Sequence, residues 1–153
     1  MNNWFTGSGY EIQFEDMMLQ IDSHVKNNGK IFIGTDSQLS ISSCLFAIAI
    51  CLHRENKGGI YFFRKVKEKS SKFSTLKIRM IAEVQKTIET AFEVLEKNPS
   101  ASIEIHIDVG IGDKSKTKIY ADELKGWASA TGFSCKIKPD AWASASVADK
   151  HTK

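Results

Sequence analysis

The stretch Ile31-Phe32-Ile33-Gly34-Thr35-Asp36-Ser37-Gln38 decides how the rest of the chain is interpreted. Its apolar run predicts a short strand over Ile31–Thr35, with Asp36 at the end of that strand. An acid in this position can form an Asx-turn, in which the carboxylate accepts backbone N–H groups. It can also stand at the mouth of an α/β sheet, where ligands collect. The other acids of the chain bear on this choice.

The segments around this stretch predict one α/β domain. Residues 11–28 have the apolar spacing of a helix, and the strands Cys44–Leu52 and Ile60–Val66 are separated by short turns, as antiparallel neighbours are. Further along, the pattern predicts a helix over about Ser74–Lys97, a strand at Ile103–Val109, a helix over about Lys116–Ala130, a strand at Phe133–Ile137 and a last helix from about Ala141. This order of strands and helices predicts a mixed sheet covered by helices.

Composition narrows the class of protein. The chain has 153 residues, 42% apolar and 25% charged, as one globular domain has and a disordered or fibrous chain does not. The longest apolar stretch, Cys44–Leu52, is too short to span a membrane, and the first residues lack the pattern of a signal peptide. The three cysteines form no CxxC pair, which argues against a zinc site or a disulfide framework. We therefore expect a reduced, cytoplasmic setting.

The net charge of +3 is too small to establish a nucleic-acid partner, but the basic residues are grouped. The groups are Arg64, Lys65, Lys67, Lys69 and Lys72; Lys114, Lys116 and Lys118; and Lys136, Lys138, Lys150 and Lys153. The first group can equally be a solvated strand edge that resists aggregation.

Four carboxylates, Asp36, Glu83, Asp108 and Asp149, lie in four different predicted segments. Acids at strand ends and on packed helices are costly to desolvate unless a positive partner meets them. A pair of divalent metal ions is the simplest partner for four converging acids, and such sites hydrolyse phosphodiesters.

Each of these acids has an ordinary alternative. Glu83 falls on the flank of its helix's apolar stripe, so it can reach the sheet or remain solvated beside Arg79 or Lys86. Asp149 shares a helix face with Trp142, but it can also belong to a solvated tail.

The strand that precedes Asp108 has a polar face of its own. Glu104, His106 and Asp108 share that face by the two-residue period, either toward solvent or as the wall of a metal site. The loop Gly110–Lys116 comes next and precedes a helix, so it can hold a phosphate or form an ordinary turn with a helix cap.

Several local motifs resemble the YkuK family of ribonuclease H-like proteins. They are Gly34-Thr35-Asp36-Ser37-Gln38, His106-Ile107-Asp108-Val109-Gly110, Lys138-Pro139 and Ala148-Asp149-Lys150-His151-Thr152-Lys153. The resemblance runs from about Lys30 to Lys153, which makes residues 1–29 an N-terminal helical extension of a single domain over 1–153. Glu83 is matched by its helix position alone.

This resemblance implies a ribonuclease H-like fold with a mixed five-stranded sheet, whose first three strands are antiparallel, flanked by helices. It also implies metal-dependent cleavage of a nucleic-acid backbone. No aromatic-rich hybrid-binding segment stands out, which argues against an RNA–DNA hybrid as the substrate.

Together these observations predict a nuclease that depends on two ions of Mg²⁺ or Mn²⁺. Asp36, Glu83, Asp108 and Asp149 are the expected metal ligands, with Asp36 bridging, and His106 is expected to help position water. The expected substrate contacts are Ser37, Gln38, Lys114, Lys116, Lys138 and Lys150. Two alternatives remain open: a non-catalytic nucleic-acid or protein binding module on the same fold, and a hydrolase of small phosphate compounds.

Overall fold

The described part of the chain folds around one mixed sheet in a computed structural model, which covers residues 3–54, 56, 58–110 and 117–153. Its strands are β1 (Trp4–Thr6), β2 (Glu11–Ile12), β3 (Lys30–Leu39), β4 (Ser43–Arg54), β5 (Gly58–Lys69), β6 (Ile103–Ile107) and β7 (Ser134–Ile137). They are ordered β2-β1-β5-β4-β3-β6-β7, with β3, β4 and β5 antiparallel and β3, β6 and β7 parallel. The predicted α/β fold class and its antiparallel first three core strands are confirmed.

The sheet has two more strands than the five predicted, because the N-terminal segment adds β1 and β2. β1 pairs with the outer edge of β5 over Phe62–Arg64, and β2 pairs with β1. The helix predicted over 11–28 accordingly begins later, as α1 (Phe14–Lys26), since Glu11 and Ile12 are used in strand pairing.

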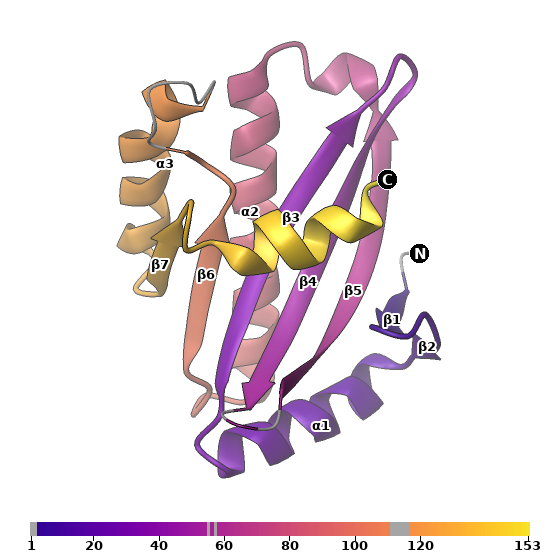
Figure 1. The fold of residues 1–153 in the computed structure, drawn as a ribbon, viewed down its shortest axis with the longest axis vertical. Helices are drawn as coiled ribbons and strands as arrows, with labels where there is room; N and C mark the ends of the chain where they lie inside the picture. Colours follow the sequence, from indigo (N-terminus) through magenta and orange to yellow (C-terminus); the bar gives the residue numbers. More distant parts are fainter. Residues whose placement is uncertain (1–2, 55, 57, 111–116) are drawn as a thin grey trace.

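Helices cover both faces of the sheet (Figure 1). On one face lies α2 (Leu76–Lys97), with α3 (Lys118–Ala130) beside it; the short turn η1 (Ser70–Lys72) leads into α2. Across the other face runs the C-terminal segment, residues 141–153, which contains the π-helical turns η2 (Ala143–Val147) and the 3-10 turn η3 (Ala148–His151). None of the helices within the described residues is long and apolar enough to cross a membrane.

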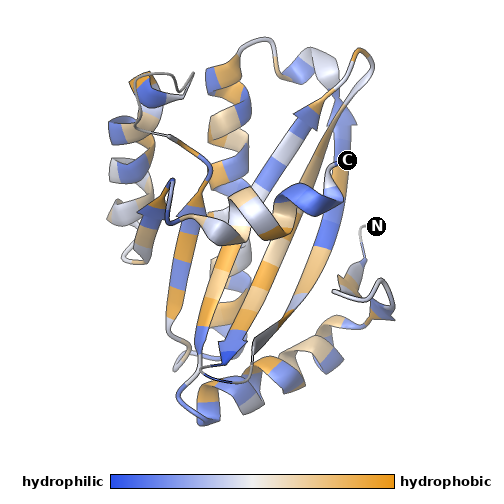
Figure 2. Ribbon diagram, viewed as in Figure 1, coloured by the Kyte–Doolittle hydropathy of each residue, from blue (hydrophilic) through white to orange (hydrophobic). Residues whose placement is uncertain are grey.

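The two faces of the sheet are packed differently, although apolar residues run through the middle strands (Figure 2). Toward α2 the strands present large side chains such as Ile33, Ile48 and Ile50. Toward the C-terminal segment they present small ones, such as Ala47 and Ala49. The small side chains let the C-terminal segment lie directly on the strands.

Two predicted boundaries were wrong. The strand expected over Ile31–Thr35 continues to Leu39, because Asp36 pairs with Ala47 and the pairing runs on to Leu39. Asp36 is therefore inside a strand, and the Asx-turn alternative does not apply. The last helix is built of π and 3-10 turns, so the helical spacing assumed for Asp149 does not describe it.

Candidate metal centre

The register of two parallel strands brings Asp36 and Asp108 together. Gly34 on β3 lies opposite His106 on β6, and this is the last pair of that ladder. Two residues further along each strand come Asp36 and Asp108, at the point where β3 continues and β6 has ended. Residues two apart on a strand share a face, so both acids enter the space where the strands separate.

Glu83 reaches the same space from α2. The hydroxyls of Thr35 and Thr87 are hydrogen-bonded at 2.7 Å, which fixes α2 against β3. One helical turn before Thr87, the side chain of Glu83 is 3% exposed and accepts a hydrogen bond from the Ser37 hydroxyl. The solvated alternative for Glu83 was wrong, since the side chain is buried; Lys86, one of its two expected partners, pairs with Glu68 at 2.8 Å.

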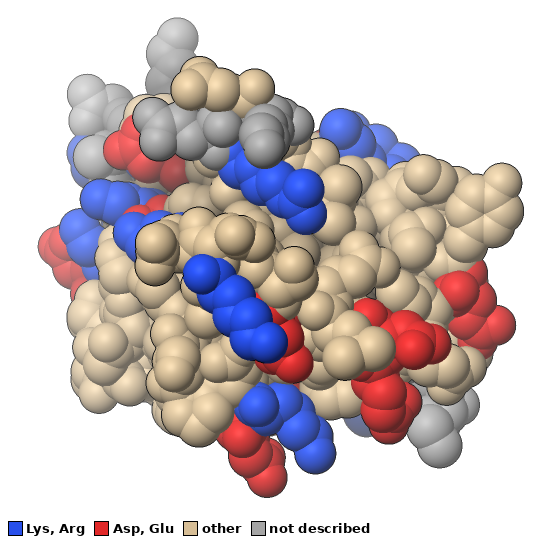
Figure 3. Space-filling view, turned by 90° about the horizontal axis from the view of Figure 1, so that it is seen from below, with Lys and Arg blue, Asp and Glu red and all other residues tan. Residues whose placement is uncertain are grey.

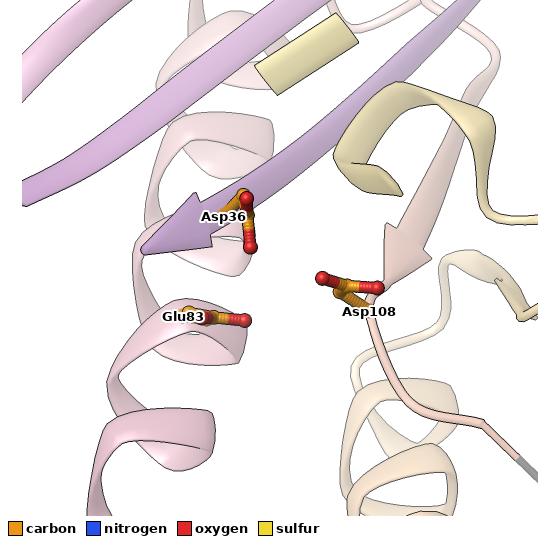
Figure 4. Close-up of side chains that lie close together, drawn as sticks. All are labelled: Asp36, Glu83 and Asp108. Carbon is orange, nitrogen blue, oxygen red and sulfur yellow. The ribbon is translucent and has the colours of Figure 1, made fainter. Parts of the chain in front are cut away.

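The three carboxylates converge on one point (Figure 4). Asp36, Glu83 and Asp108 each offer an oxygen, and these oxygens lie within 4.8 Å of one another. Figure 4 shows them coming from β3, from α2 and from the end of β6. Oxygen donors grouped in this way are the ligands that hard divalent cations such as Mg²⁺ and Mn²⁺ prefer.

The electrostatics of the cluster favour a bound cation. Burial, together with hydrogen bonds to Asp149 and Asp108, raises the pKa of Asp36 to about 8. Burial also raises the pKa of Glu83 well above its ordinary range. Without a cation the cluster thus holds protons at neutral pH, and a divalent ion would replace them. The residues present therefore fit a divalent metal.

Asp149 and two lysines surround the cluster. The Asp149 side chain, 37% exposed, lies on η3, and its hydrogen bond with Asp36 is the main cause that lowers its pKa. Lys153 Nζ lies 3.1 Å from Asp149 Oδ2, and Lys138 Nζ lies 2.8 Å from Asp108 Oδ1. The contact with Asp108 is the main cause that raises the pKa of Lys138. Lys138, expected to contact a phosphate, thus contacts an acid of the cluster here.

His106 is held by other groups. The backbone N–H of Ala143 donates to His106 Nδ1 at 3.0 Å, so Nδ1 carries no proton and Nε2 must carry it. Nε2 then donates to Glu104 Oε2 at 2.8 Å. Burial lowers the pKa of His106, in keeping with a neutral ring. Because both nitrogens are engaged, these contacts do not supply the expected role in positioning water; they tie β6 to the C-terminal segment.

The remaining expected substrate contacts are scattered. The Ser37 hydroxyl is used by Glu83, and Gln38 lines a groove at the far end of β3. Lys150 lines a pocket of about 250 Å³ with Trp142 and Tyr61, among others, on the other side of the C-terminal segment. Lys114 and Lys116 lie outside the described residues.

Sequence reasoning missed three partners in and near the cluster: Ser37 as the donor to Glu83, Lys138 as the cation beside Asp108, and Glu104 as the acceptor for His106. The two-residue period of the strand places Glu104 and His106 on one face, so their contact could have been predicted from the sequence. No comparable signal links Lys138 to Asp108, because their contact depends on how the chain returns after β7.

Comparison with known proteins agrees with this geometry. The family described as Ribonuclease H-like matches residues 12–153. A Bacillus subtilis (strain 168) protein named "Uncharacterized protein YkuK" is 27% identical over 162 residues, which cover 94% of this chain and 92% of that protein. The resemblance inferred from the sequence motifs is confirmed: this chain belongs to the Ribonuclease H-like family.

Proposed function

We propose that the protein hydrolyses phosphodiester bonds of RNA or DNA, using two divalent ions, Mg²⁺ or Mn²⁺. Asp36, Glu83 and Asp108 would hold the ions, and Asp149 would complete the set of ligands. One observation carries the proposal: three acids from three separate elements meet within 4.8 Å, two of them buried with a raised pKa. Membership of the Ribonuclease H-like family supports a nucleic acid as the substrate.

The chain's own residues have distinct parts in this proposal. Bound metal would lower the pKa of a water molecule and offset the charge of the leaving oxygen. Ser37 orients the Glu83 carboxylate through its hydroxyl, and Lys138 offsets charge on Asp108. Asp149, which is hydrogen-bonded to Asp36, would be a further carboxylate ligand for a bound ion.

The test is cleavage of end-labelled single-stranded RNA, single-stranded DNA, duplexes, an RNA–DNA hybrid and a branched junction in Mg²⁺ or Mn²⁺. Asp36→Asn removes one ligand charge and keeps the side-chain shape. Glu96→Gln, at an exposed position of α2, is the matched control. Cutting by the wild type and the control but not by Asp36→Asn supports the proposal and names the substrate. Full metal-dependent activity in Asp36→Asn overturns the assignment.

A non-catalytic binding module is the second candidate, and the Lys138–Asp108 contact favours it. Lys138 places a positive charge beside Asp108 without any metal. A binding module that does not catalyse a reaction could be stabilised by this contact alone. Such a module would bind nucleic acid or protein without metal-dependent turnover. Calorimetry with Mn²⁺ separates the two, because only the nuclease requires the acids to bind the ion.

A further inference from the structure

A polar groove opens on the sheet face that carries Asp36. Thr35 points toward α2, as its hydrogen bond with Thr87 shows, so Asp36 and Gln38 point to the opposite face, which the C-terminal segment crosses. Along β3 the groove begins at Gln38, one side-chain position or ~7 Å beyond Asp36. Its volume is about 330 Å³, and its lining residues are Gln38, Ser40, Ser43, Leu45, Lys67, Thr152 and Lys153.

The register aligns a row of lysines with this groove. Lys65 lies across the sheet from Asp36 through Ala47, and Lys67 lies across from Gln38 through Leu45. Residues directly opposite on antiparallel strands share a face, so Lys65, Lys67 and Lys69 project on the side of the groove. All three are exposed.

No acid among the described residues forms an ion pair with these lysines. Glu68 stands on the opposite face of β5, where it pairs with Lys72 and Lys86. The far end of the molecule differs, since acidic and basic side chains lie close together there (Figure 3). Positive charge is thus gathered at the end of the sheet that holds the acid cluster.

The far wall of the groove connects it to the candidate metal centre. Lys153 lines the groove and also contacts Asp149, whose carboxylate is hydrogen-bonded to Asp36. The hydroxyls of Ser40 and Thr152 already donate to the carbonyl oxygens of Ser43 and Asp149, so the donors that the groove offers are the ammonium groups of Lys67 and Lys153 and the amide of Gln38. Lysine ammonium groups and hydroxyls are the donors that phosphate oxygens of a nucleic-acid backbone usually receive.

We propose that this groove binds the sugar–phosphate backbone of the nucleic-acid strand and leads it to the acid cluster. The inference rests on the proposed function, because it assigns the path of that function's substrate. Lys67 and Lys69 contact successive phosphates, the Gln38 amide binds the sugar–phosphate between them, and recognition is independent of base sequence.

The test is binding without metal, in EDTA, so that cleavage plays no part. The probes are a short fluorescein-labelled single-stranded RNA and the DNA of the same sequence, titrated by anisotropy at several salt concentrations. Lys67→Glu/Lys69→Glu changes the groove. Lys97→Glu/Lys125→Glu makes the same change of charge at exposed positions of α2 and α3.

We expect the groove variant to lose ~10-fold or more in affinity for at least one probe, and its salt dependence to weaken by ~1.4 in slope, about 0.7 for each lost phosphate contact with a single strand. The control should keep the wild-type slope. An equal loss of affinity in both variants, or no loss in the groove variant, would overturn the groove as the binding site. That result is expected if the lysines only protect a strand edge from aggregation.

Cleavage assays in metal keep the two proposals apart. Unchanged KM and turnover in Lys67→Glu/Lys69→Glu would refute the groove and leave the nuclease in place. Groove-dependent binding by a wild type that cuts none of the substrates would refute the nuclease and leave the groove in place.

Discussion

The Glu104–His106 pair on β6 and the Asp36–Glu83–Asp108 cluster, which α2, β3 and the end of β6 supply, are neighbouring polar groups whose charges are compensated differently. Burial acts to raise the pKa of Glu104, but His106 and Lys30 together lower it below its ordinary range. For Asp36, burial and the neighbouring acids Asp149 and Asp108 act in the same direction and together raise the pKa to about 8. The protein thus supplies partners for the pair, whereas in the cluster Lys138 contacts Asp108 and, among the described residues, no ion pair meets the buried Asp36 and Glu83. This unmet charge, rather than burial, distinguishes a candidate functional site from a structural contact.

The largest expected effect comes from Glu83→Gln. We expect metal-dependent cleavage to fall by ~1,000-fold or more, equivalent to ~4 kcal/mol in the barrier, because a neutral amide is a poor ligand. The free energy of unfolding without metal should stay the same or rise, since glutamine still accepts from Ser37 and removes a buried charge. Single-turnover cleavage and urea denaturation measure the two quantities. If cleavage by Glu83→Gln stays within ~10-fold of the wild type, Glu83 has a structural role, as the Glu104–His106 pair has.

The next effect in size is expected from His106→Ala. The ring is 1% exposed, is bonded at both nitrogens and packs against Phe32 and Trp142. Its loss leaves a cavity and leaves Glu104 with Lys30 as its only ion-pair partner among the described residues, so we expect a loss of ~3 kcal/mol in the free energy of unfolding.

Urea denaturation gives this value, and Glu104→Gln is the control. Glutamine can still accept from His106 Nε2, so the loss should stay below ~1 kcal/mol. A similar loss in both variants would mean that the charge of Glu104, rather than the hydrogen bond to His106, holds the pair together.

A smaller effect is expected from Gly34→Ala, which tests how the C-terminal segment is seated. A Cβ at Gly34 would lie 2.5 Å from the backbone nitrogen of Ser144, so the segment that carries Asp149 must move. We expect a loss of ~2 kcal/mol in stability and a fall in turnover. Gly126→Ala on α3 is the control, because a Cβ at Gly126 would have no neighbouring atom within 4 Å. There alanine should leave the stability unchanged or raise it by up to ~1 kcal/mol. Equal thermal melting of the two variants would contradict the close approach.

The smallest effect expected is a pH dependence of stability in metal-free protein. Asp36 has a raised pKa, so the folded state holds a proton between the ordinary value of 3.8 and about 8 that the unfolded state releases. Stability from this group is complete below pH 3.8 and is lost as pH rises toward 8. The melting temperature of Asp36→Asn should therefore exceed that of the wild type increasingly with pH, by ~3 °C or more at pH 8.

His106 contributes the opposite slope, since its pKa lies below the ordinary 6.5 and its stabilisation is lost as pH falls. That contribution is common to both proteins, so it cancels in their difference, which reports Asp36 together with the acids that it contacts. A difference in melting temperature that does not change with pH would show that Asp36 is ionised in the folded protein.

The sequence was sufficient for the fold class and for two of the acids, because Asp36 and Asp108 follow strong apolar runs. It misplaced the end of β3, since hydrogen bonds from Asp36–Leu39 to the facing residues of β4 extend the strand past its apolar stretch. It missed β1, whose three residues depend on pairing with β5. Strand pairing between distant segments leaves no local pattern to detect.

The site was predicted less completely than the fold. The position of Glu83 on the flank of its stripe left burial and solvation equally open, and the Thr35–Thr87 contact that decides it joins two distant segments. The place of Asp149 depends on π and 3-10 turns, which a regular helical spacing does not describe. Lys138 reaches Asp108 only through the path of the chain after β7.

The most direct test of the difference between the acid cluster and the Glu104–His106 pair is thermal melting at increasing Mn²⁺ concentrations for the wild type, Asp36→Asn and Glu104→Gln. A ligand that binds only the folded state raises the melting temperature by mass action, by ~2.7 kcal/mol of stability at a concentration one hundred times its Kd. We predict that Mn²⁺ stabilises the wild type and Glu104→Gln alike and leaves Asp36→Asn unchanged. Equal stabilisation of Asp36→Asn, or loss of the effect in Glu104→Gln, would contradict the assignment of the cation site to Asp36, Glu83 and Asp108.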